Sequence, residues 1–440
     1  MFRGRKRKAG KAGKTAADDS RPPCKYGAKC YRKNADHMKN FSHAAAKCLF
    51  CVLVSQSEGK IKCFMVSLII FIPEKTKTSP DTIRELAEKS NDSLKIAGSP
   101  DGSGVASAHD DSGSRTAPDE SDAEEMPDSP EDVRESIRQK FLVEMPRDFY
   151  DFWEFCKSLD RRKPEDALYE SLGLRLVGPF DVLAGKLKNS TVKKSDDFLR
   201  HWRYYYDPPE MQTVLRGDDE KMYHLGYFRD DPNEMPVFVA SNAVADGCRI
   251  TKVAGNLFGA LSKEISKALK HCKDVKERSA LRKLNGSLIE FAEEKRYSIK
   301  EASKKRPATQ SATFHTAGLV VPVDKRTDVG YRPLPMSEAQ LKSLLNRISR
   351  CKEDEANNPH MDDLQNLVTR VNIANDECDY GMGLEFGIDL FCFGEPIFHP
   401  TIVMQTTLAY QLLNREPFAR ILKAHLRRRL KSANLSALSS

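Results

Sequence analysis

Hydrophobic residues at a helical spacing predict where the folded body of this chain begins. Apolar positions three or four residues apart form one face of a helix, and the residues on this face are Phe149, Phe152, Trp153, Cys156 and Leu159. The same periodicity predicts helices over about 255–272, 277–297 and 364–374. Ser337 and Gln340 have the spacing of a capping box, so another helix is expected to begin there.

Short runs rich in aromatic and β-branched residues lie between these helical segments and predict strands. The runs are LRLVGPF, WRYYYD, MYHLGYF and MPVFVAS, and Asp, Pro or Gly separates one from the next. A further strand is expected at 319–323. Strands and helices do not alternate regularly and the sequence has no G-x-G-x-x-G turn, which excludes a dinucleotide-binding fold. We therefore predict an α+β protein with two packed mixed lobes, at 137–312 and 313–430.

Composition favours a folded protein inside the cell. The chain has 440 residues, of which 40% are hydrophobic and 30% are charged, and its mean hydropathy is -0.55. The longest apolar run, 63–73, is far shorter than the roughly 20 residues of a spanning helix, so no membrane association is expected. No apolar stretch follows the basic N-terminus, which excludes a secretory signal. The eleven cysteines are too scattered for a disulfide scaffold, so clustered cysteines indicate metal ligands.

Charge is distributed unevenly along the chain. Residues 1–47 contain 14 Lys and Arg against 3 Asp and Glu, whereas residues 101–135 contain 12 acidic and 2 basic side chains. The acidic stretch predicts a disordered linker. The basic head predicts either a solvated tail or a functional segment, which would be a nuclear import signal or a contact with nucleic acid, and we favour the nucleus. The expected division is a basic tail at 1–20, a metal-binding segment at 21–47, an insertion and acidic linker at 48–136, the two lobes, and a tail at 431–440.

Two cysteines and two histidines within twenty residues predict a small metal site. Cys24, Cys30, His37 and His43 supply two thiolates and two imidazoles, a ligand set of tetrahedral zinc. The alternative is a pair of unrelated cysteines beside surface histidines. The spacing C-x5-C-x6-H-x5-H differs from that of DNA-reading fingers, in which a twelve-residue spacer forms the helix for the major groove. Structural zinc is predicted, but with a ligand other than the bases of duplex DNA.

This segment resembles the poly(ADP-ribose)-binding zinc finger, whose core motif is C-x-Y-G-x-x-C-Y-R. The matching residues are Cys24, Tyr26, Gly27, Cys30, Tyr31 and Arg32. The resemblance implies that Tyr26, Tyr31 and Arg32 bind poly(ADP-ribose). Adenine stacking on a tyrosine ring and pairing of pyrophosphate with a guanidinium agree with that role. Tyr26 can alternatively form the small core of the finger.

Acidic residues gather near the end of the helix predicted at 364–374. Asp376, Glu377 and Asp379 lie within four positions, and Gly381 and Gly383 follow them, which permits tight backbone geometry. The pattern indicates either a site or an exposed acidic turn. The ligand order of an EF-hand is absent, so calcium binding of that kind is not expected.

Several runs of the folded body resemble the histone PARylation factor family, in the same order and over about residues 137–430. They are HWRYYYDPPE, GYFRD, GLVVPVD, DVGYR and NDECDYGMGLE. Members of this family join a poly(ADP-ribose) polymerase and complete a shared active site. The resemblance implies a nuclear chromatin factor that acts at DNA damage and directs ADP-ribosylation to serine, mainly on histones. The finger and the acidic linker replace the family's usual short front segment.

The resemblance also implies roles for single residues. The family's catalytic glutamate falls on Glu377, which would act as general base toward a serine hydroxyl. The residues implied in polymerase binding are Tyr331, Arg332, Asp376, Cys378 and Asp379. NAD would be held by the polymerase, so this chain would contribute to an enzyme without being a complete one.

Two other functions remain open from the sequence. A non-catalytic poly(ADP-ribose) reader or adaptor would use the acidic segment only structurally. A free-standing ADP-ribosyl hydrolase would need an acid and a base such as Asp376 and Glu377, although adjacent residues rarely face each other across a scissile bond. A Glu377→Ala variant without consequence would support the adaptor. Turnover of an ADP-ribosylated peptide without a polymerase would support the hydrolase.

Two further clusters are interpreted as structural. The aromatic residues at 201–206 are expected in the core, because aromatics in a predicted strand are more often buried than catalytic. The basic run Arg427, Arg428 and Arg429 is expected to form a solvated helix face.

Overall fold

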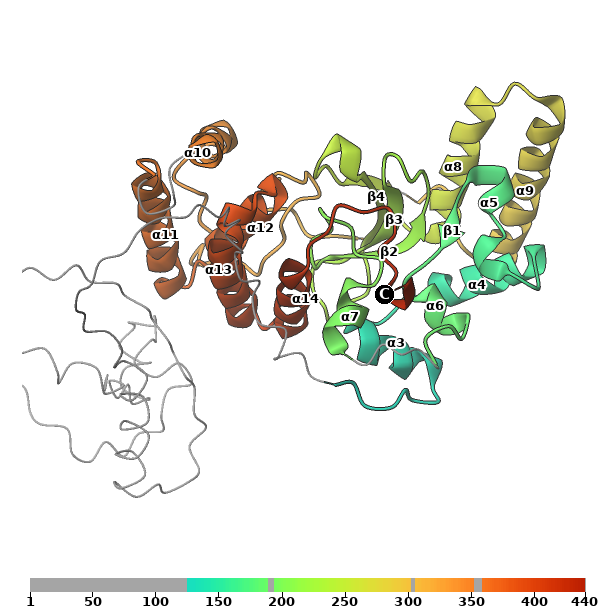
Figure 1. Cartoon of the computed structure of the whole chain (residues 1–440), viewed down its shortest axis with the longest axis horizontal. Helices are drawn as coiled ribbons and strands as arrows, with labels where there is room; N and C mark the ends of the chain where they lie inside the picture. The colour runs from blue at the N-terminus through green and yellow to red at the C-terminus, as the bar shows by residue number, and fades with distance from the viewer. Residues whose placement is uncertain (1–124, 189–193, 302–304, 352–357, 440) are drawn as a thin grey trace, which may run out of the picture. The chain divides into compact units, whose positions relative to one another are not determined.

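The computed structural model describes residues 125–188, 194–301, 305–351 and 358–439 (Figure 1). The predicted zinc ligands, the proposed polymer-binding residues, the basic head and most of the acidic linker therefore lie outside the described residues. The elements described below all belong to the compact unit that comprises residues 111–440.

A five-stranded antiparallel sheet forms the centre of the first part of the fold. Its strands follow one another in chain order: β1 (Arg175–Leu176), β2 (Met211–Arg216), β3 (Tyr223–Phe228), β4 (Phe238–Ala243) and β5 (Thr251–Ala254). Each pairs with the next in sequence. Together with the helices, this sheet confirms the predicted α+β class.

Seven helices complete the first hydrophobic core. In the sequence they precede β1, lie between β1 and β2, or follow β5. They are α3 (Val133–Phe141), α4 (Arg147–Leu159), α5 (Tyr169–Leu172), α6 (Phe180–Leu183), α7 (Ser195–Arg200), α8 (Leu257–His271) and α9 (Val275–Glu294). Four residues of the stripe predicted on α4 are confirmed, because Phe149, Phe152, Trp153 and Cys156 are buried, whereas Leu159 at the end of the helix is 37% exposed. Phe149 and Phe152 pack in one core with Leu225 of β3 and Phe258 of α8.

The second hydrophobic core lies among the later helices, which gather on the other side of the sheet from α8 and α9 in Figure 1. They are α10 (Glu338–Arg350), α11 (Met361–Asp376), α12 (Tyr380–Phe393), α13 (His399–Leu412) and α14 (Glu416–Arg427). The capping box of Ser337 and Gln340 is confirmed at the start of α10. Helix α12 is the central one: residues 381–392 are all buried, as expected for a helix that is apolar on nearly every side.

The strand expected at 319–323 is not formed. This stretch makes only one isolated bridge, from Leu319 to Ser311, and a second bridge follows it between Asp324 and Val329. Pro322 has no N–H to donate to a ladder, which explains why a run of β-branched residues stays outside the sheet.

The run WRYYYD is also not a strand, although Trp202, Tyr204 and Tyr205 are buried as expected and Tyr206 is half-buried. Trp202 has a positive φ of 55°, and the peptide N–H of Asp207 bonds the carbonyl of Tyr204, so the chain turns here. The Tyr204 ring stacks on the His224 ring with centroids 3.9 Å apart. Local turns followed by Pro208 and Pro209 overcome the β propensity of the run.

The end of the described chain packs against the middle of the sequence. The backbone N–H of Trp202 donates to the Leu435 carbonyl at 3.0 Å. Arg429 donates to the carbonyls of Tyr205 (2.7 Å) and Phe391 (2.8 Å). The interpretation of 427–429 as a solvated face is therefore wrong for Arg429, because its stem and head are used inside the fold.

Four short 3-10 helices complete the description: Pro164–Asp166, Val244–Asp246, Pro396–Phe398 and Ala437–Ser439. Among the helices described, none is both long and apolar enough to cross a membrane.

Candidate active site

The acidic segment forms a sharp reversal between α11 and α12. Three backbone N–H groups close the end of α11: those of Glu377, Cys378 and Asp379 donate to carbonyls of α11 at 3.0, 3.1 and 2.8 Å. Cys378 has a left-handed φ of 70°, which a residue with a Cβ adopts only at a cost of about 1–2 kcal/mol. We call residues 376–379 the acidic loop. Backbone hydrogen bonds alone therefore fix the conformation of this loop.

Asp379 anchors the acidic loop to a second segment, residues 328–332. Its side chain is buried, and one carboxylate oxygen, Oδ1, accepts the N–H of Gly330 at 2.9 Å. The N–H of Gly381 in turn donates to the carbonyl of Gly330, also at 2.9 Å. Two segments about fifty residues apart in sequence are thus bonded to each other through Gly330.

The approach of these two segments requires glycine. Gly330 has a φ of +132°, and a Cβ built on it would lie 2.2 Å from the carbonyl oxygen of Pro322. A Cβ on Gly381 would lie 2.8 Å from both Tyr331 and Val321 side-chain carbons. A larger residue at 330 would therefore clash with the backbone at Pro322, and one at 381 would clash with the side chains of Val321 and Tyr331.

Arg332 bridges two carboxylates of the acidic loop. Its Nη2 atom lies 2.5 Å from Glu377 Oε2 and 2.8 Å from Asp379 Oδ2. The side chains of Arg332 and Glu377 are 47% and 54% exposed, whereas that of Asp379 is only 8% exposed. The hydrogen bond to Glu377 is the main cause that raises the pKa of Arg332 above its usual value. Arg332 is thus held from beneath by Asp379 while it orients Glu377 at the surface.

Asp376 lies beside the ion-paired triad of Arg332, Glu377 and Asp379 without joining it. It is the last residue of α11 and is exposed. In the part of the chain that the structure describes, its side chain has no hydrogen bond or ion pair. Its carboxylate is therefore available to a partner molecule, and the same charge attracts basic segments.

Two buried carboxyl groups lie behind the acidic loop on α12. Glu385 accepts hydrogen bonds from the hydroxyls of Tyr331 (2.9 Å) and Ser311 (2.6 Å), and Asp389 accepts one from the N–H of Phe314 (2.8 Å). Burial raises the pKa of Glu385, and it raises the pKa of Asp389 to about 8. Sequence reasoning missed both groups. The available signal was two acids spaced i, i+4 on an otherwise apolar helix.

The structure brings together five of the six residues predicted for this site. Arg332, Glu377 and Asp379 form the triad, Tyr331 is fixed by Glu385, and Cys378 makes the turn. Asp376 shares the acidic loop but not its hydrogen bonds. The described residues contain no group of three or more His, Cys, Asp or Glu side chains that could hold a metal, and the predicted zinc ligands lie outside them.

This geometry supplies a reactive group but not a closed catalytic centre. An exposed carboxylate held by an arginine can accept a proton from a group that approaches it from solvent. Glu377 and Arg332 are each about half exposed, so the chain by itself does not exclude water from this carboxylate. The acidic loop is suited to complete a site on another molecule.

Comparison with known proteins finds matches to both the folded body and the N-terminal segment. The family model of histone PARylation factor 1 matches residues 132–429, and the model of the PBZ domain matches residues 21–46. Histone PARylation factor 1 of Bos taurus is 44% identical over 68% of this chain and 88% of the relative. The protein of the same name from Mus musculus is 45% identical over 67% and 86%, and that from Danio rerio is 43% identical over 70% and 89%.

Proposed function

The chain belongs to the histone PARylation factor 1 family, and from this we propose that its acidic loop supplies a catalytic carboxylate to the active site of a poly(ADP-ribose) polymerase. The observation that carries the proposal is Glu377, a half-exposed carboxylate fixed by Arg332 at the tip of a rigid loop. The polymerase binds NAD, and the substrate is a serine hydroxyl, mainly on histones.

Glu377 acts as the general base. The serine oxygen forms a bond to the anomeric carbon of the nicotinamide ribose while the bond from that carbon to nicotinamide breaks. The hydroxyl proton passes to the Glu377 carboxylate. Because a serine hydroxyl is a weak nucleophile at neutral pH, this proton transfer accelerates the attack.

The neighbouring residues bind the polymerase and keep Glu377 in place. Arg332 presents an exposed guanidinium, and Asp376 presents an exposed carboxylate without a partner among the described residues. Asp379 contributes through Arg332, since its own carboxylate is buried. Tyr331 and Cys378 shape the same surface by fixing the two backbone segments.

The N-terminal segment binds the polymer that the shared active site produces. The PBZ match supports zinc held by Cys24, Cys30, His37 and His43, and poly(ADP-ribose) bound by Tyr26, Tyr31 and Arg32. A chain that joins this finger to the folded body raises the local concentration of Glu377 at modified chromatin, provided that it spans both sites. The protein acts in the nucleus, on chromatin at sites of DNA damage. The basic head adds direct contact with DNA.

The test compares NAD-dependent modification of a histone peptide by the polymerase with wild-type protein and with Glu377→Gln. The peptide is used with its serine and with alanine in that place. We expect serine-dependent transfer with wild type only, while binding of Glu377→Gln to the polymerase is retained. Equal transfer with both proteins would overturn the general-base role and leave a poly(ADP-ribose) reader as the better account.

A second variant separates binding from chemistry. Arg332→Ala removes the exposed guanidinium, so we expect loss of polymerase binding together with loss of transfer. Saturating concentrations of Arg332→Ala should restore part of the transfer, because Glu377 is still present. The same excess of Glu377→Gln should restore none.

A further inference from the structure

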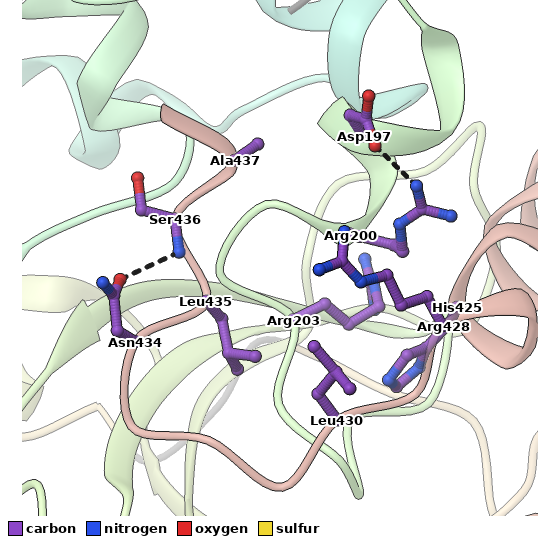
Figure 2. Close-up of a pocket in the computed structure, with 10 residues that line it drawn as sticks. All are labelled: Asp197, Arg200, Arg203, His425, Arg428, Leu430, Asn434, Leu435, Ser436 and Ala437. Carbon is purple, nitrogen blue, oxygen red and sulfur yellow. Dashed lines mark hydrogen bonds and ion pairs between the residues drawn. The ribbon is translucent and has the colours of Figure 1, made fainter. Parts of the chain in front are cut away.

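A cavity of about 200 Å³ lies between α7, the end of α14 and residues 430–437 (Figure 2). It shares no residue with the acidic loop. Arg200, Arg203, Arg428 and His425 line one side, and the chain at 434–437 lines the other. The backbone of 434–437 is held in place by bonds from Trp202 N to Leu435 O and from Ala437 N to His201 Nδ1, each 3.0 Å long. The wall is therefore part of the fold.

Positive charge dominates this cavity. Three guanidinium groups line it against a single carboxylate, that of Asp197, which is 2.5 Å from Arg200. Arg203 is buried and fixed, because it donates to the carbonyls of Leu199, Pro208 and Met211. Burial lowers its pKa to about 10, so it stays protonated at neutral pH. A fixed excess of cationic donors is the arrangement that binds an anion.

Arg200 and Arg428 retain donors for such an anion. Arg200 uses Nη1 on the Ala424 carbonyl and Nη2 on Asp197, and Nη1 also lies 3.8 Å from Asp196 Oδ2; these bonds leave further N–H groups of its five. Arg428 is exposed, and in the described part of the chain its guanidinium has no hydrogen bond or ion pair. The cavity thus contains an arginine whose charge is not neutralised by the fold.

The imidazole of His425 is the second, independent sign of a ligand. The residue is only 2% exposed, yet within the described residues neither Nδ1 nor Nε2 has a hydrogen-bond partner. Its ring packs on Phe391 with centroids 5.6 Å apart. Buried polar atoms are nearly always hydrogen-bonded, so an imidazole that lines a cavity without a partner indicates a group that is bound there.

We propose that this cavity binds a small phosphate group, either a phosphate monoester or a pyrophosphate, with Arg200, Arg428 and His425 as donors. The volume supports this size of ligand. Sites for drug-sized molecules occupy roughly 300–1,000 Å³, so a cavity of about 200 Å³ accommodates a phosphate or pyrophosphate group but not a whole dinucleotide. Oxygen acceptors would satisfy the guanidinium and imidazole N–H groups at once.

An anion in the cavity changes the protonation of His425. The charged and titratable groups around the ring are Arg200, Arg203, Arg428, Arg429, His399 and Asp197. Burial, and then the neighbouring cations, hold the pKa of His425 well below its usual range. A bound phosphate offsets those cations and is expected to raise the pKa of His425.

The first experiment titrates the full-length protein with sodium pyrophosphate by calorimetry at constant ionic strength. Arg428→Ala removes an exposed side chain, and the matched control is Arg282→Ala, which removes an exposed arginine from α9. We expect saturable binding by wild type and by Arg282→Ala, and at least about tenfold weaker binding by Arg428→Ala, the loss of one charged hydrogen-bond donor. Absence of saturable binding by wild type, or equal binding by the two variants, would overturn the proposal.

The second experiment follows His425 itself by NMR of protein that contains carbon-13-labelled histidine. The chain has ten histidines, and His425→Gln identifies the signal that belongs to His425. Pyrophosphate is expected to shift this signal, and an unchanged signal at saturation would exclude His425 as a donor. Adding ADP-ribose tests whether the phosphate can come from a nucleotide. A shift of the His425 signal would show that its phosphates enter this cavity, whereas binding at the N-terminal finger alone would leave the signal unchanged. Because no polymerase is present, these results are independent of the general-base proposal.

Discussion

Glu377 and Glu385 lie on either side of the start of α12, and their surroundings differ in almost every respect. Glu377 is half exposed and bonded to a charged guanidinium. Glu385 is buried and accepts hydrogen bonds from two neutral hydroxyls, and burial raises its pKa. Asp389, one turn further along, is buried as well. The exposed acids are available to a partner, whereas the buried acids hold together the segments that position them.

This contrast separates two kinds of contribution that one acidic sequence run can make. A carboxylate at the surface stays ionised, and it costs the fold little. A buried carboxyl group is protonated more easily, and it couples folding to pH. The predictions below test whether chemistry resides in the first kind and stability in the second.

The largest expected effect is on the rate of transfer. Glu377→Gln should lower polymerase-dependent serine modification by about 10²–10⁴-fold, the usual contribution of a general base. Its thermal midpoint should stay that of wild type. Glu385→Gln should lower the thermal midpoint. Its transfer rate should fall only in proportion to the fraction of the protein that is folded. Equal loss of rate in both variants at full folding would remove the distinction.

The next largest effect is on stability, and it is expected at Gly330 in the segment 328–332, which is bonded to the acidic loop. Gly330→Ala should destabilise the fold by about 2–4 kcal/mol, through backbone strain and the clash with the Pro322 carbonyl. The matched control is Gly286→Ala in α9, where a Cβ meets open space. That change should stabilise by about 0.5–1 kcal/mol. Urea unfolding measures both, and a neutral Gly330→Ala would show that residue 330 is not held against the Pro322 carbonyl.

The pH dependence of stability isolates Asp389. Its pKa of about 8 in the folded protein lies above the value of about 3.9 for an unfolded chain. The folded state therefore holds a proton that the unfolded state has lost, and stability falls as pH rises between these two values. The slope from this group is at most about 1.4 kcal/mol per pH unit.

Asp389→Asn should remove that slope, because the amide oxygen still accepts the N–H of Phe314 and has no proton to lose. Urea unfolding at pH 5.5 and pH 7.5 compares the variant with wild type. A wild-type stability that rises over this range relative to Asp389→Asn would contradict the assignment.

The smallest effect on stability is expected at the exposed end of the triad. Arg332→Ala breaks an ion pair to Glu377 that is largely in solvent and one to the buried Asp379, whose carboxylate keeps the N–H of Gly330, so the free energy of unfolding should fall by about 1 kcal/mol. Polymerase binding, measured by calorimetry, should weaken by about tenfold or more. Arg347→Ala on α10 provides a control for loss of a positive charge. A large loss of stability in Arg332→Ala would place Arg332 among the structural groups instead.

Much of the fold could be predicted wherever one periodic pattern acted alone. The stripe on α4, the capping box of α10 and the paired helices α8 and α9 follow from local spacing and were found at about the expected residues. The strand at 319–323 and the run WRYYYD were wrong, because a proline without an N–H and a series of local turns outweighed β propensity. Propensity describes a residue, but not which partner its backbone will find.

In the candidate site, too, local motifs were predictable and tertiary contacts were not. Family motifs identified Glu377 and Arg332, and the structure then showed them in contact. The support beneath them was not predictable, because Ser311, Tyr331 and Glu385 come together only through tertiary packing. The cavity beside α14 was missed for the same reason: the basic run at 427–429 gave no sign that its three arginines would face different neighbours.

The bonds from Arg429 to Tyr205 and Phe391, and from Trp202 to Leu435, also bear on how the protein is made. Residues 429–435 leave the ribosome after the sheet has been made, yet they close on the middle of the sequence. The nascent chain can fold its sheet early, since domains generally begin to fold from the N-terminal side. It can finish α12 and the layer around it only after residues 429–435 have left the ribosome. A message cut short before residue 429 would therefore yield a protein with Glu377 present in sequence but without its complete scaffold.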